Sequence, residues 1–387
     1  MYQYKDIIEM NSNSGESIFS QDNNVKIFTK GKDKFDSLLK DIREAKETIH
    51  ILYYIINNDN IGNEIVKLLT EKAKEGVEVR LLYDHLGSLF TPKRMFKELI
   101  KAGGRVYRFF PLKFGTYLRI NYRNHRKLVI IDGKVGYVGG MNIGDEYLGL
   151  HKRIKPWRDT HLRITGTSVY SLQERFLMDW AYASSKIEET DATTLRKFFP
   201  EIKQEGKMGV QILSSGPDVN GEQIKLGYIK MINSAKEKVY IQTPYFIPDD
   251  SFLEALEMAS LSGVDVRIMI PAVPDKVFVY RATTSYMEDI LKHGGKVYLY
   301  PGFLHSKMII IDGKVTSIGT ANMDIRSFAL DFEINAFIYD TEFSGKASSI
   351  FEKDMEASKQ ITKELYDARG IKTKVLEALS RLLSPLL

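Results

Sequence analysis

The sequence predicts an α/β protein built from two duplicated β-α-β lobes, each a mixed sheet flanked by helices. Two observations lead to this fold class. The same order of segments occurs twice: a β-branched or aromatic run, a helix-spaced apolar pattern, then a glycine followed by an alternating strand pattern. Each copy then continues into an Asp-Gly sequence between apolar runs, which predicts a β-hairpin. Repetition on this scale indicates a gene-duplicated, two-lobed protein.

Each element of the first copy has a counterpart in the second. Strands are predicted at residues 51–56 and 239–246, where apolar and aromatic residues dominate. Helices follow, with apolar residues at helical spacing; these are Ile65, Leu68 and Leu69 in the first copy and Phe252, Leu253, Leu256 and Ala259 in the second. Gly76 and Gly263 end these helices and precede alternating strands. A double glycine at residues 103–104 and 294–295 introduces the next strand of each copy.

These elements set the expected domain boundaries. We expect a polar N-terminal segment at residues 1–24, a first lobe at 25–185, a charged linker at 186–207, a second lobe at 208–370 and a C-terminal amphipathic helix at 371–387. The first lobe carries an extra segment around residues 111–121, whose mixed aromatic and basic composition is typical of an interfacial loop. The C-terminal helix is expected to dock on the body of the protein, with membrane contact as the alternative.

Composition narrows the function classes. Of 387 residues, 43% are apolar and 27% charged, as in a soluble globular protein, and 55 Lys and Arg against 50 Asp and Glu favour an anionic partner. The chain has no cysteine, which excludes disulfide scaffolds, thiolate metal sites and cysteine nucleophiles. No apolar run reaches the roughly 20 residues of a spanning helix, and the N-terminus has no signal-peptide pattern. The chain is therefore expected to be soluble or peripheral.

One motif occurs at matching places in both copies. The pattern His-x-Lys-x-x-x-x-Asp runs from His125 to Asp132 and again from His305 to Asp312. On a strand, residues two apart share a face, so each histidine lies beside the lysine that follows it, Lys127 or Lys307. Each motif leads into a glycine-rich return that ends in an asparagine, Asn142 or Asn322.

These residues resemble the phospholipase D superfamily, which is defined by two such His-Lys-Asp (HKD) motifs, and within it the bacterial cardiolipin synthases. Supporting segments are residues 83–88, 156–161, 242–249, 319–327 and 382–387, and the resemblance covers residues 24–387. It implies duplicated phospholipase D-like lobes with the active site between them. It also implies a transferase of phospholipid biosynthesis that joins two phosphatidylglycerol molecules into cardiolipin and glycerol without a cofactor.

The chain departs from that family in two places. Asp331 stands where family members commonly have asparagine, a difference we expect to be minor. The N-terminal membrane-spanning segments usual in the family are absent from the chain, so we expect a catalytic part that acts peripherally at the bacterial cell membrane, on its cytoplasmic face, with phosphatidylglycerol and the anionic membrane surface as partners. The oligomeric state is left open, and no nucleic acid is expected as a partner.

The residue types fit metal-free cleavage of a phosphodiester. That chemistry needs a nucleophile, a general acid and fixed positive charge around the phosphoryl oxygens. Two histidines can supply the first two, the paired lysines the charge, and Asn142 and Asn322 amide hydrogens. Aligning the copies places Asp159 and Glu333 at corresponding positions, which predicts one orienting carboxylate for each histidine. By resemblance His125 is the nucleophile and His305 the acid and base; the residue pattern fits the reverse equally well.

The other candidates carry weaker signals. Asp132 and Asp312 are expected to be structural, because an Asp-Gly turn favours aspartate. Close strand packing is at least as good an explanation as phosphate binding for Gly139, Gly140 and Gly319.

Basic and aromatic residues near the motifs are candidates for substrate binding: Arg123, Arg126, Arg158, His161 and Tyr245. His85 is expected at a strand end, either functional or capping, and His50, His151 and His293 on the surface or in loops. No residue pattern predicts a metal site.

Two alternatives to a synthase remain open on the sequence. One is a phospholipase D-type phosphodiesterase that transfers to water and acts on phospholipid or nucleic acid. The other is a non-catalytic binder of anionic membranes that kept the fold. Both motifs are intact, and the loss of either histidine would be the expected mark of a non-catalytic copy.

Overall fold

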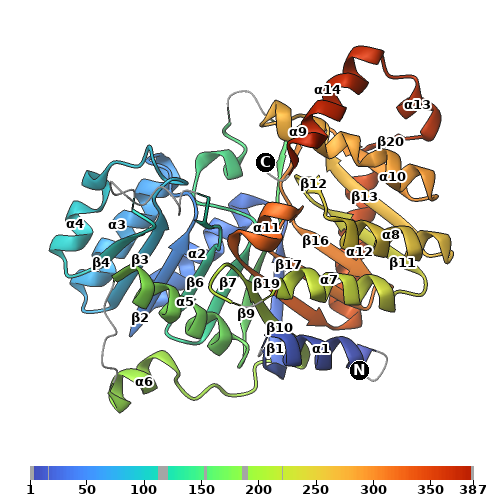
Figure 1. Cartoon of the computed structure of the whole chain (residues 1–387). Helices are drawn as coiled ribbons and strands as arrows, with labels where there is room; N and C mark the ends of the chain where they lie inside the picture. Colours follow the sequence, from blue (N-terminus) through green and yellow to red (C-terminus); the bar gives the residue numbers. More distant parts are fainter. Residues whose placement is uncertain are drawn as a thin grey trace.

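The computed structural model describes residues 4–15, 17–111, 121–151, 155–184, 191–219 and 221–384, and two lobes lie side by side in it (Figure 1). Their strands belong to one continuous sheet of sixteen strands. Along this sheet the order is β20-β14-β13-β11-β16-β17-β19-β10-β1-β9-β7-β6-β2-β3-β4, and β5 pairs with β19. The predicted α/β class with a duplicated mixed sheet is confirmed.

In the first lobe three parallel strands and three antiparallel strands form the half-sheet. The parallel strands are β2 (Thr48–Tyr53), β3 (Glu78–Asp84) and β4 (Arg105–Phe109). The antiparallel strands are β6 (Leu128–Ile131), β7 (Val135–Gly139) and β9 (His161–Thr165). The main helices are α2 (Gly31–Glu44), α3 (Asn60–Lys74) and α5 (Val169–Ser184), with the short α4 (Lys97–Lys101).

The second lobe repeats this order. Its parallel strands are β11 (Lys238–Gln242), β13 (Asp265–Pro271) and β14 (Lys296–Tyr300). Its antiparallel strands are β16 (Met308–Ile311), β17 (Val315–Gly319) and β19 (Asp331–Tyr339). The helices are α7 (Gln223–Ser234), α8 (Asp250–Leu261), α9 (Val277–Ser285), α10 (Met287–Lys292), α11 (Ile325–Ala329), α12 (Thr341–Glu356), α13 (Lys363–Asp367) and α14 (Ile371–Leu382). The short edge strand β20 (Lys359–Ile361) pairs with β14.

Both predicted hairpins form around their Asp-Gly turns. Asp132 and Gly133 have φ of 51° and 62°, and Asp312 and Gly313 have φ of 53° and 63°, as a two-residue hairpin turn requires. The aspartates do more than permit the turn. The Asp132 carboxylate accepts three main-chain N–H groups at residues 46–48, and the Asp312 carboxylate accepts three at residues 236–238. Each carboxylate thus ties its hairpin to the start of β2 or β11.

The N-terminal segment differs from the prediction. Residues predicted as a polar segment outside the lobes form α1 (Lys5–Gly15) and most of β1 (Phe19–Phe28). The first part of β1 pairs with β10 (Met208–Ser215) and the second part with β9, so β1 joins the two half-sheets at their junction (Figure 1). The sequence did not predict strand β1, because its side chains are mostly polar and strand prediction relies on apolar alternation.

The predicted linker also contains structure. Helix α6 (Ala192–Phe198) lies within residues 186–207 and buries Phe198 against the first lobe. The Phe198 ring lies 5.0 Å from the ring of His50 and 4.9 Å from the Arg80 guanidinium. This segment therefore packs on the first lobe as well as connecting the halves.

The described residues form three apolar cores. One lies between the first half-sheet and α2 and α3, and another between the second half-sheet and α7, α8 and α9. The third is shared: it combines Leu128 and Val138 of the first half with Met308 and Ile318 of the second, together with residues of α5 and α12. Because burial of apolar side chains is the main stabilising term, this shared core fixes the lobes against each other. Within the described ranges, no helix has the length and apolar character needed to cross a bilayer.

Candidate active site

Both motifs lie at the same edge of the sheet, where the parallel strands end. Leu52 at the end of β2 is opposite Leu128, and Gln242 at the end of β11 is opposite Met308. Lys127 and Lys307 directly precede these antiparallel strands. Ligand sites of α/β sheets commonly form beyond the carboxyl ends of such strands.

Each histidine is held by main-chain contacts from the opposite lobe. The His125 amide donates to the Phe332 carbonyl at 2.9 Å, where β5 (Arg123–Asn124) runs parallel to the start of β19. The His305 amide donates to the Arg158 carbonyl at 2.7 Å, where β15 (Phe303–Leu304) pairs with β8 (Trp157–Arg158). The two motifs therefore meet at one site between the lobes.

The predicted carboxylates pair with the histidines crosswise. The Nδ1 atom of His125 lies 2.8 Å from Glu333 Oε1, and the Nδ1 atom of His305 lies 2.7 Å from Asp159 Oδ2. Both carboxylates are buried, whereas each imidazole side chain remains slightly exposed, 12% for His125 and 11% for His305. Because the carboxylate accepts the Nδ1 hydrogen, the lone pair of each neutral imidazole is at Nε2.

Burial dominates the electrostatics of the imidazoles. It lowers the pKa of His125 to about 4; Glu333 opposes this shift and Lys127 adds to it. Burial and Lys307 lower the pKa of His305 to about 4, against the effect of Asp159. Both imidazoles are therefore neutral at pH 7 without substrate. A bound anion would raise both pKa values, because it stabilises the protonated form.

The two lysines are buried beside the histidines that precede them. Lys127 Nζ donates to the His125 carbonyl at 2.5 Å, and Lys307 Nζ donates to the His305 carbonyl at 2.6 Å. Burial lowers the pKa of Lys127 to about 7 and of Lys307 to about 8. Buried ammonium groups need a counter-charge, so the site favours an anionic ligand such as a phosphodiester.

The two asparagines of the glycine-rich returns also lie here, with different surroundings. Asn142 Oδ1 accepts the Ile55 amide at 3.2 Å, and its Nδ2 donates to the Tyr147 hydroxyl at 2.8 Å. One amide hydrogen of Asn142 is thereby used within the protein. Asn322 is 7% exposed, and its Oδ1 has no hydrogen-bond partner among the described residues.

Aromatic rings frame the two histidines, and sequence reasoning missed them. The Tyr54 ring lies edge-on to His125 with centroids 4.9 Å apart. His305 is stacked on Phe303 at 5.7 Å and has Trp157 at 6.1 Å and Tyr147 at 6.2 Å. Tyr54 directly follows β2 and Phe303 lies two residues before His305, so their proximity to strand ends and motifs was the available signal. These rings bury the imidazoles and so contribute to their lowered pKa values.

Two of the predicted substrate-binding residues, Arg126 and Arg158, are held in ion pairs within the protein, and a third, His161, is buried. Arg126 is fully buried and forms a bidentate pair with Asp179 at 2.7 and 2.8 Å. Arg158 is 6% exposed and pairs with Asp354 at 3.0 Å. His161 is fully buried on β9, and its two ring nitrogens have no hydrogen-bond partner among the described residues; burial lowers its pKa, and the charges of Lys34 and Lys127 add to that shift. These ion pairs account for the two arginines, and sequence proximity to a motif does not reveal such long-range partners. A substrate contact by His161 stays a prediction.

Arg123 and Tyr245 keep positions compatible with substrate contact. Arg123 is half-buried beside Asp84 and Arg326, next to the His125 segment. The Tyr245 hydroxyl donates to Asp275 at 2.5 Å, and the Asp275 carboxylate is close enough to influence the pKa of Lys307.

The remaining histidines have varied environments. His50 was predicted on the surface or in a loop, but it is fully buried on β2, stacked on Phe176 at 4.7 Å. Burial lowers the pKa of His50 to about 3. His85 follows β3, as predicted, and its Nε2 is 3.1 Å from Arg108. His293 directly follows α10 and contacts the Asp289 carbonyl at 2.9 Å, and His151 is partly exposed.

Glycines near the motifs allow close packing. A Cβ on Gly140 would lie 2.1 Å from Asp159 Oδ1, and one on Gly319 would lie 2.3 Å from the Asn335 side chain. Gly139 has a φ of 154° and packs against the His161 backbone. Close packing accounts for all three, and Gly140 in particular leaves room for the carboxylate that contacts His305.

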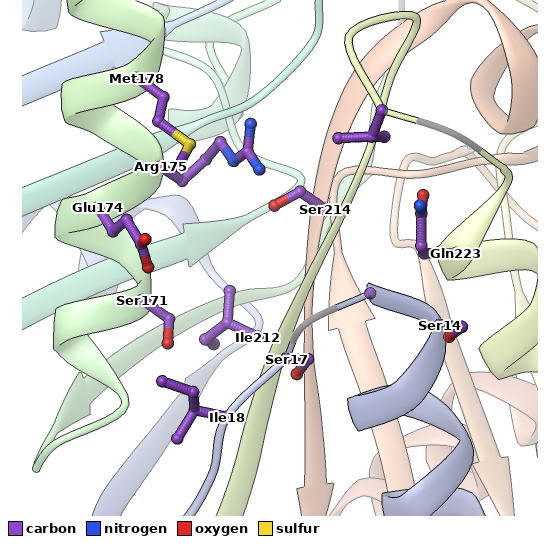
Figure 2. Close-up of a pocket in the computed structure, with 12 residues that line it drawn as sticks. Ser14, Ser17, Ile18, Ser171, Glu174, Arg175, Met178, Ile212, Ser214 and Gln223 are labelled. Carbon is purple, nitrogen blue, oxygen red and sulfur yellow. The ribbon is translucent and has the colours of Figure 1, made fainter.

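Some predictions fall outside the described residues. These are residues 112–120 of the extra loop and residues 385–387 of the predicted C-terminal helix. A separate hollow of about 350 Å³ lies beside α5 and the β1–β10 junction (Figure 2). Ser171, Glu174 and Arg175 line one side of it and Ser214 another, and it contains none of the predicted site residues.

Among the residues that the structure covers, no cluster of three or more His, Asp or Glu side chains could hold a metal ion.

Comparison with known proteins decides the family. The family described as "Cardiolipin synthase, PLD-like domain" matches residues 38–180 and 228–355, one segment in each lobe. The chain belongs to this family of phospholipase D-like cardiolipin synthases. It is 52% identical to the major cardiolipin synthase of Bacillus subtilis and 50% identical to the cardiolipin synthase of Listeria monocytogenes serotype 4b (strain F2365). Each match covers the whole chain and 80% of the relative.

Solved structures support the fold of this cardiolipin synthase family member. The phosphatidylserine synthase of Haemophilus influenzae superposes with a TM-score of 0.73 at 15% identity, over 99% of this chain and all of that protein. The polyphosphate kinase of Porphyromonas gingivalis superposes with a TM-score of 0.58 at 14% identity, over 93% of this chain and 52% of that protein. At these identities the likeness concerns the fold alone.

Proposed function

We propose that this chain is a cardiolipin synthase that transfers a phosphatidyl group from one phosphatidylglycerol to another and releases glycerol. The observation that carries the proposal is the pair of imidazoles, each bound at Nδ1 by a buried carboxylate and each next to a buried lysine. Membership of the cardiolipin synthase family supports the choice of substrate.

In the first step His125 Nε2 attacks the phosphorus of the donor lipid. A P–N bond forms, the P–O bond to the glycerol headgroup breaks, and a phosphatidyl-histidine results. His305 protonates the leaving glycerol oxygen. Glu333 stabilises the positive charge that develops on the His125 ring, as a buried carboxylate does for a catalytic imidazole.

In the second step a second phosphatidylglycerol displaces His125 from phosphorus. His305, now neutral, removes the proton from a headgroup hydroxyl of a second phosphatidylglycerol, whose oxygen attacks phosphorus. A P–O bond forms, the P–N bond breaks, and cardiolipin leaves with His125 restored. One phosphodiester is exchanged for another, so no nucleotide is needed.

The charges of the site suit these steps. Lys127 and Lys307 stabilise the negative charge on the non-bridging oxygens, and Asn142 and Asn322 donate amide hydrogens to them. The anionic substrate raises the pKa of His305, so that it carries the proton required of a general acid. The enzyme is expected to work at the surface of an anionic bacterial membrane, where its lipid substrate lies.

The test is to incubate the purified protein with phosphatidylglycerol in mixed micelles and separate the lipid products. Cardiolipin with an equal amount of glycerol, lost in both His125→Ala and His305→Ala, is the expected result. Phosphatidic acid as the sole product would show a hydrolase instead. Mass spectrometry of the wild-type protein, rapidly quenched during turnover, distinguishes the roles of the histidines: the phosphatidyl adduct is expected on His125, and an adduct on His305 would reverse the assignment.

A further inference from the structure

We propose that an apolar rim at the active-site edge of the sheet docks onto an anionic phospholipid bilayer. This docking rim consists of Leu89, Phe90, Val277, Phe278, Leu379 and Leu382. The proposal rests on the proposed function in one respect, namely that the substrate is a lipid held in a bilayer.

The first part of the rim follows β3 in the first lobe. Phe90 is 95% exposed, so its side chain lacks the favourable free energy that burial of a phenylalanine gives. The residues just before it hold the catalytic surroundings in place: the Ser88 hydroxyl donates to the Tyr54 carbonyl at 3.0 Å, and the Tyr54 ring lies against His125. Leu89 and Phe90 therefore project beside the His125 half of the site.

The second part occupies the equivalent place in the second lobe, after β13. Phe278 is 61% exposed and Val277 beside it 52%. Asp275, two residues earlier, accepts the Tyr245 hydroxyl and influences the pKa of Lys307. The duplicated fold thus places an exposed phenylalanine next to each half of the site, at the edge where the parallel strands of both lobes end.

The third part is helix α14, whose polar side chains face the protein and whose apolar side chains face outward. It lies across α9 (Figure 1), and the side chain that it buries there is polar: Glu377 accepts from the Thr284 hydroxyl at 2.8 Å. Its apolar side chains face outward, with Leu379 54% and Leu382 78% exposed. The helix packs on the body of the protein, as expected, but through polar side chains and not through its leucines. An outward apolar stripe is stable when another apolar phase covers it.

The charges of the three segments indicate which partner covers the docking rim. Residues 85–97 contain no acidic side chain, and the single acid of 371–384, Glu377, is buried and paired with Arg369. Residues 276–286 also lack an acid, and the exposed Asp275 before them accepts the Tyr245 hydroxyl. Exposed basic residues accompany the apolar ones: Lys93, Arg94, Lys276, Lys372 and Lys374. Basic side chains around an apolar surface match an anionic bilayer, whereas two copies of this surface would repel each other.

The experiment measures binding separately from turnover. Wild-type protein and the double variant Phe90→Ala/Phe278→Ala are mixed with vesicles of phosphatidylcholine containing 30% phosphatidylglycerol, and bound protein is separated by flotation. We expect the double variant to bind at least tenfold more weakly, and binding of wild type to fall with added salt. The matched control is Leu261→Ala: Leu261 is 70% exposed but ends α8 at the opposite edge of the sheet, so binding should not change.

The outcomes separate this proposal from the proposed function. Vesicle binding that depends on Phe90 and Phe278, without any cardiolipin product, would support the rim and refute the synthase. Cardiolipin synthesis with equal vesicle binding by wild type and double variant would refute the rim alone. Disruption of a dimer in the double variant, seen by size-exclusion chromatography with vesicle binding unchanged, would assign the surface to a second copy and overturn the proposal.

Discussion

Replacement of Glu333 by glutamine tests whether a buried carboxylate drives the chemistry of His125. The change keeps the size of the side chain and leaves an amide oxygen that can still accept the Nδ1 hydrogen. It removes the negative charge 2.8 Å from the imidazole, at a side chain that has no solvent exposure. Water cannot replace the lost charge there, so the effect should appear in the rate.

The expected loss follows from two contributions. A hydrogen bond to a charged acceptor contributes about 1.5–3 kcal/mol and one to a neutral acceptor about 0.5–1.5 kcal/mol, so the bond alone weakens by about 1–2 kcal/mol. When His125 becomes cationic, an opposite charge about 4 Å away contributes up to about 4 kcal/mol at an effective dielectric constant of about 20. The two contributions overlap, because the extra strength of a hydrogen bond to a charged acceptor is itself electrostatic, so they are not added. A loss of about 2–4 kcal/mol corresponds to a rate about 30- to 1,000-fold slower.

The assay follows formation of the phosphatidyl-enzyme after rapid mixing with phosphatidylglycerol micelles. Glu78→Gln is the matched control, because Glu78 is ion-paired with Arg80 at 2.7 Å at the far end of β3 and its loss should leave the rate unchanged. NMR of the imidazole nitrogens should show that Glu333→Gln shifts His125, and that Asp159→Asn shifts His305. A rate for Glu333→Gln within threefold of wild type would refute the reasoning.

Three further changes probe the surroundings of the site. The pKa of His50 is about 3 in the folded protein and about 6.5 in the unfolded chain, so below pH 6.5 the unfolded state binds one more proton. The free energy of unfolding therefore falls as the pH drops from 6.5 towards 3. His50→Phe should remove about 2 kcal/mol of the acid-induced loss between pH 7.5 and 5, measured by urea unfolding. Asp132→Ala should cost about 2–3 kcal/mol of stability, since its carboxylate binds three main-chain N–H groups, with unchanged turnover per folded molecule well below the melting temperature. Gly140→Ala should reduce turnover more than tenfold by displacing Asp159, whereas Gly345→Ala, with open space around its Cβ, should leave turnover unchanged; equal activities would contradict the role assigned to Gly140.

The duplicated architecture and the two motifs could be predicted because their signals are local. An Asp-Gly pair between apolar runs specifies a hairpin by its own φ values, and His125 and Lys127 share a strand face by spacing alone. The position of Asp159 and Glu333 in the repeat alignment indicated that they correspond, but alignment does not say which carboxylate contacts which histidine. The crosswise pairing depends on how the lobes pack, and that is set by the shared core rather than by any local pattern.

The errors have the same physical origin. Arg126 looks like a substrate ligand next to a motif, yet its partner Asp179 is 53 residues away in the chain and buries it. His50 lies in a run of strand residues, and only tertiary packing against Phe176 and Phe198 places its ring in the core. Long-range pairs of buried polar residues leave no periodic signature in a sequence.

The strand at the junction has a consequence for how the chain is made. The ribosome delivers β1 early, but its partner residues in β10 begin at Met208, about 180 residues after β1 ends. At about 5–20 residues per second, the first part of β1 waits for about 10–40 s with an open edge. Open edges invite pairing with other chains, and charged side chains suppress it. Asp22 places such a charge in the part of β1 that waits for β10.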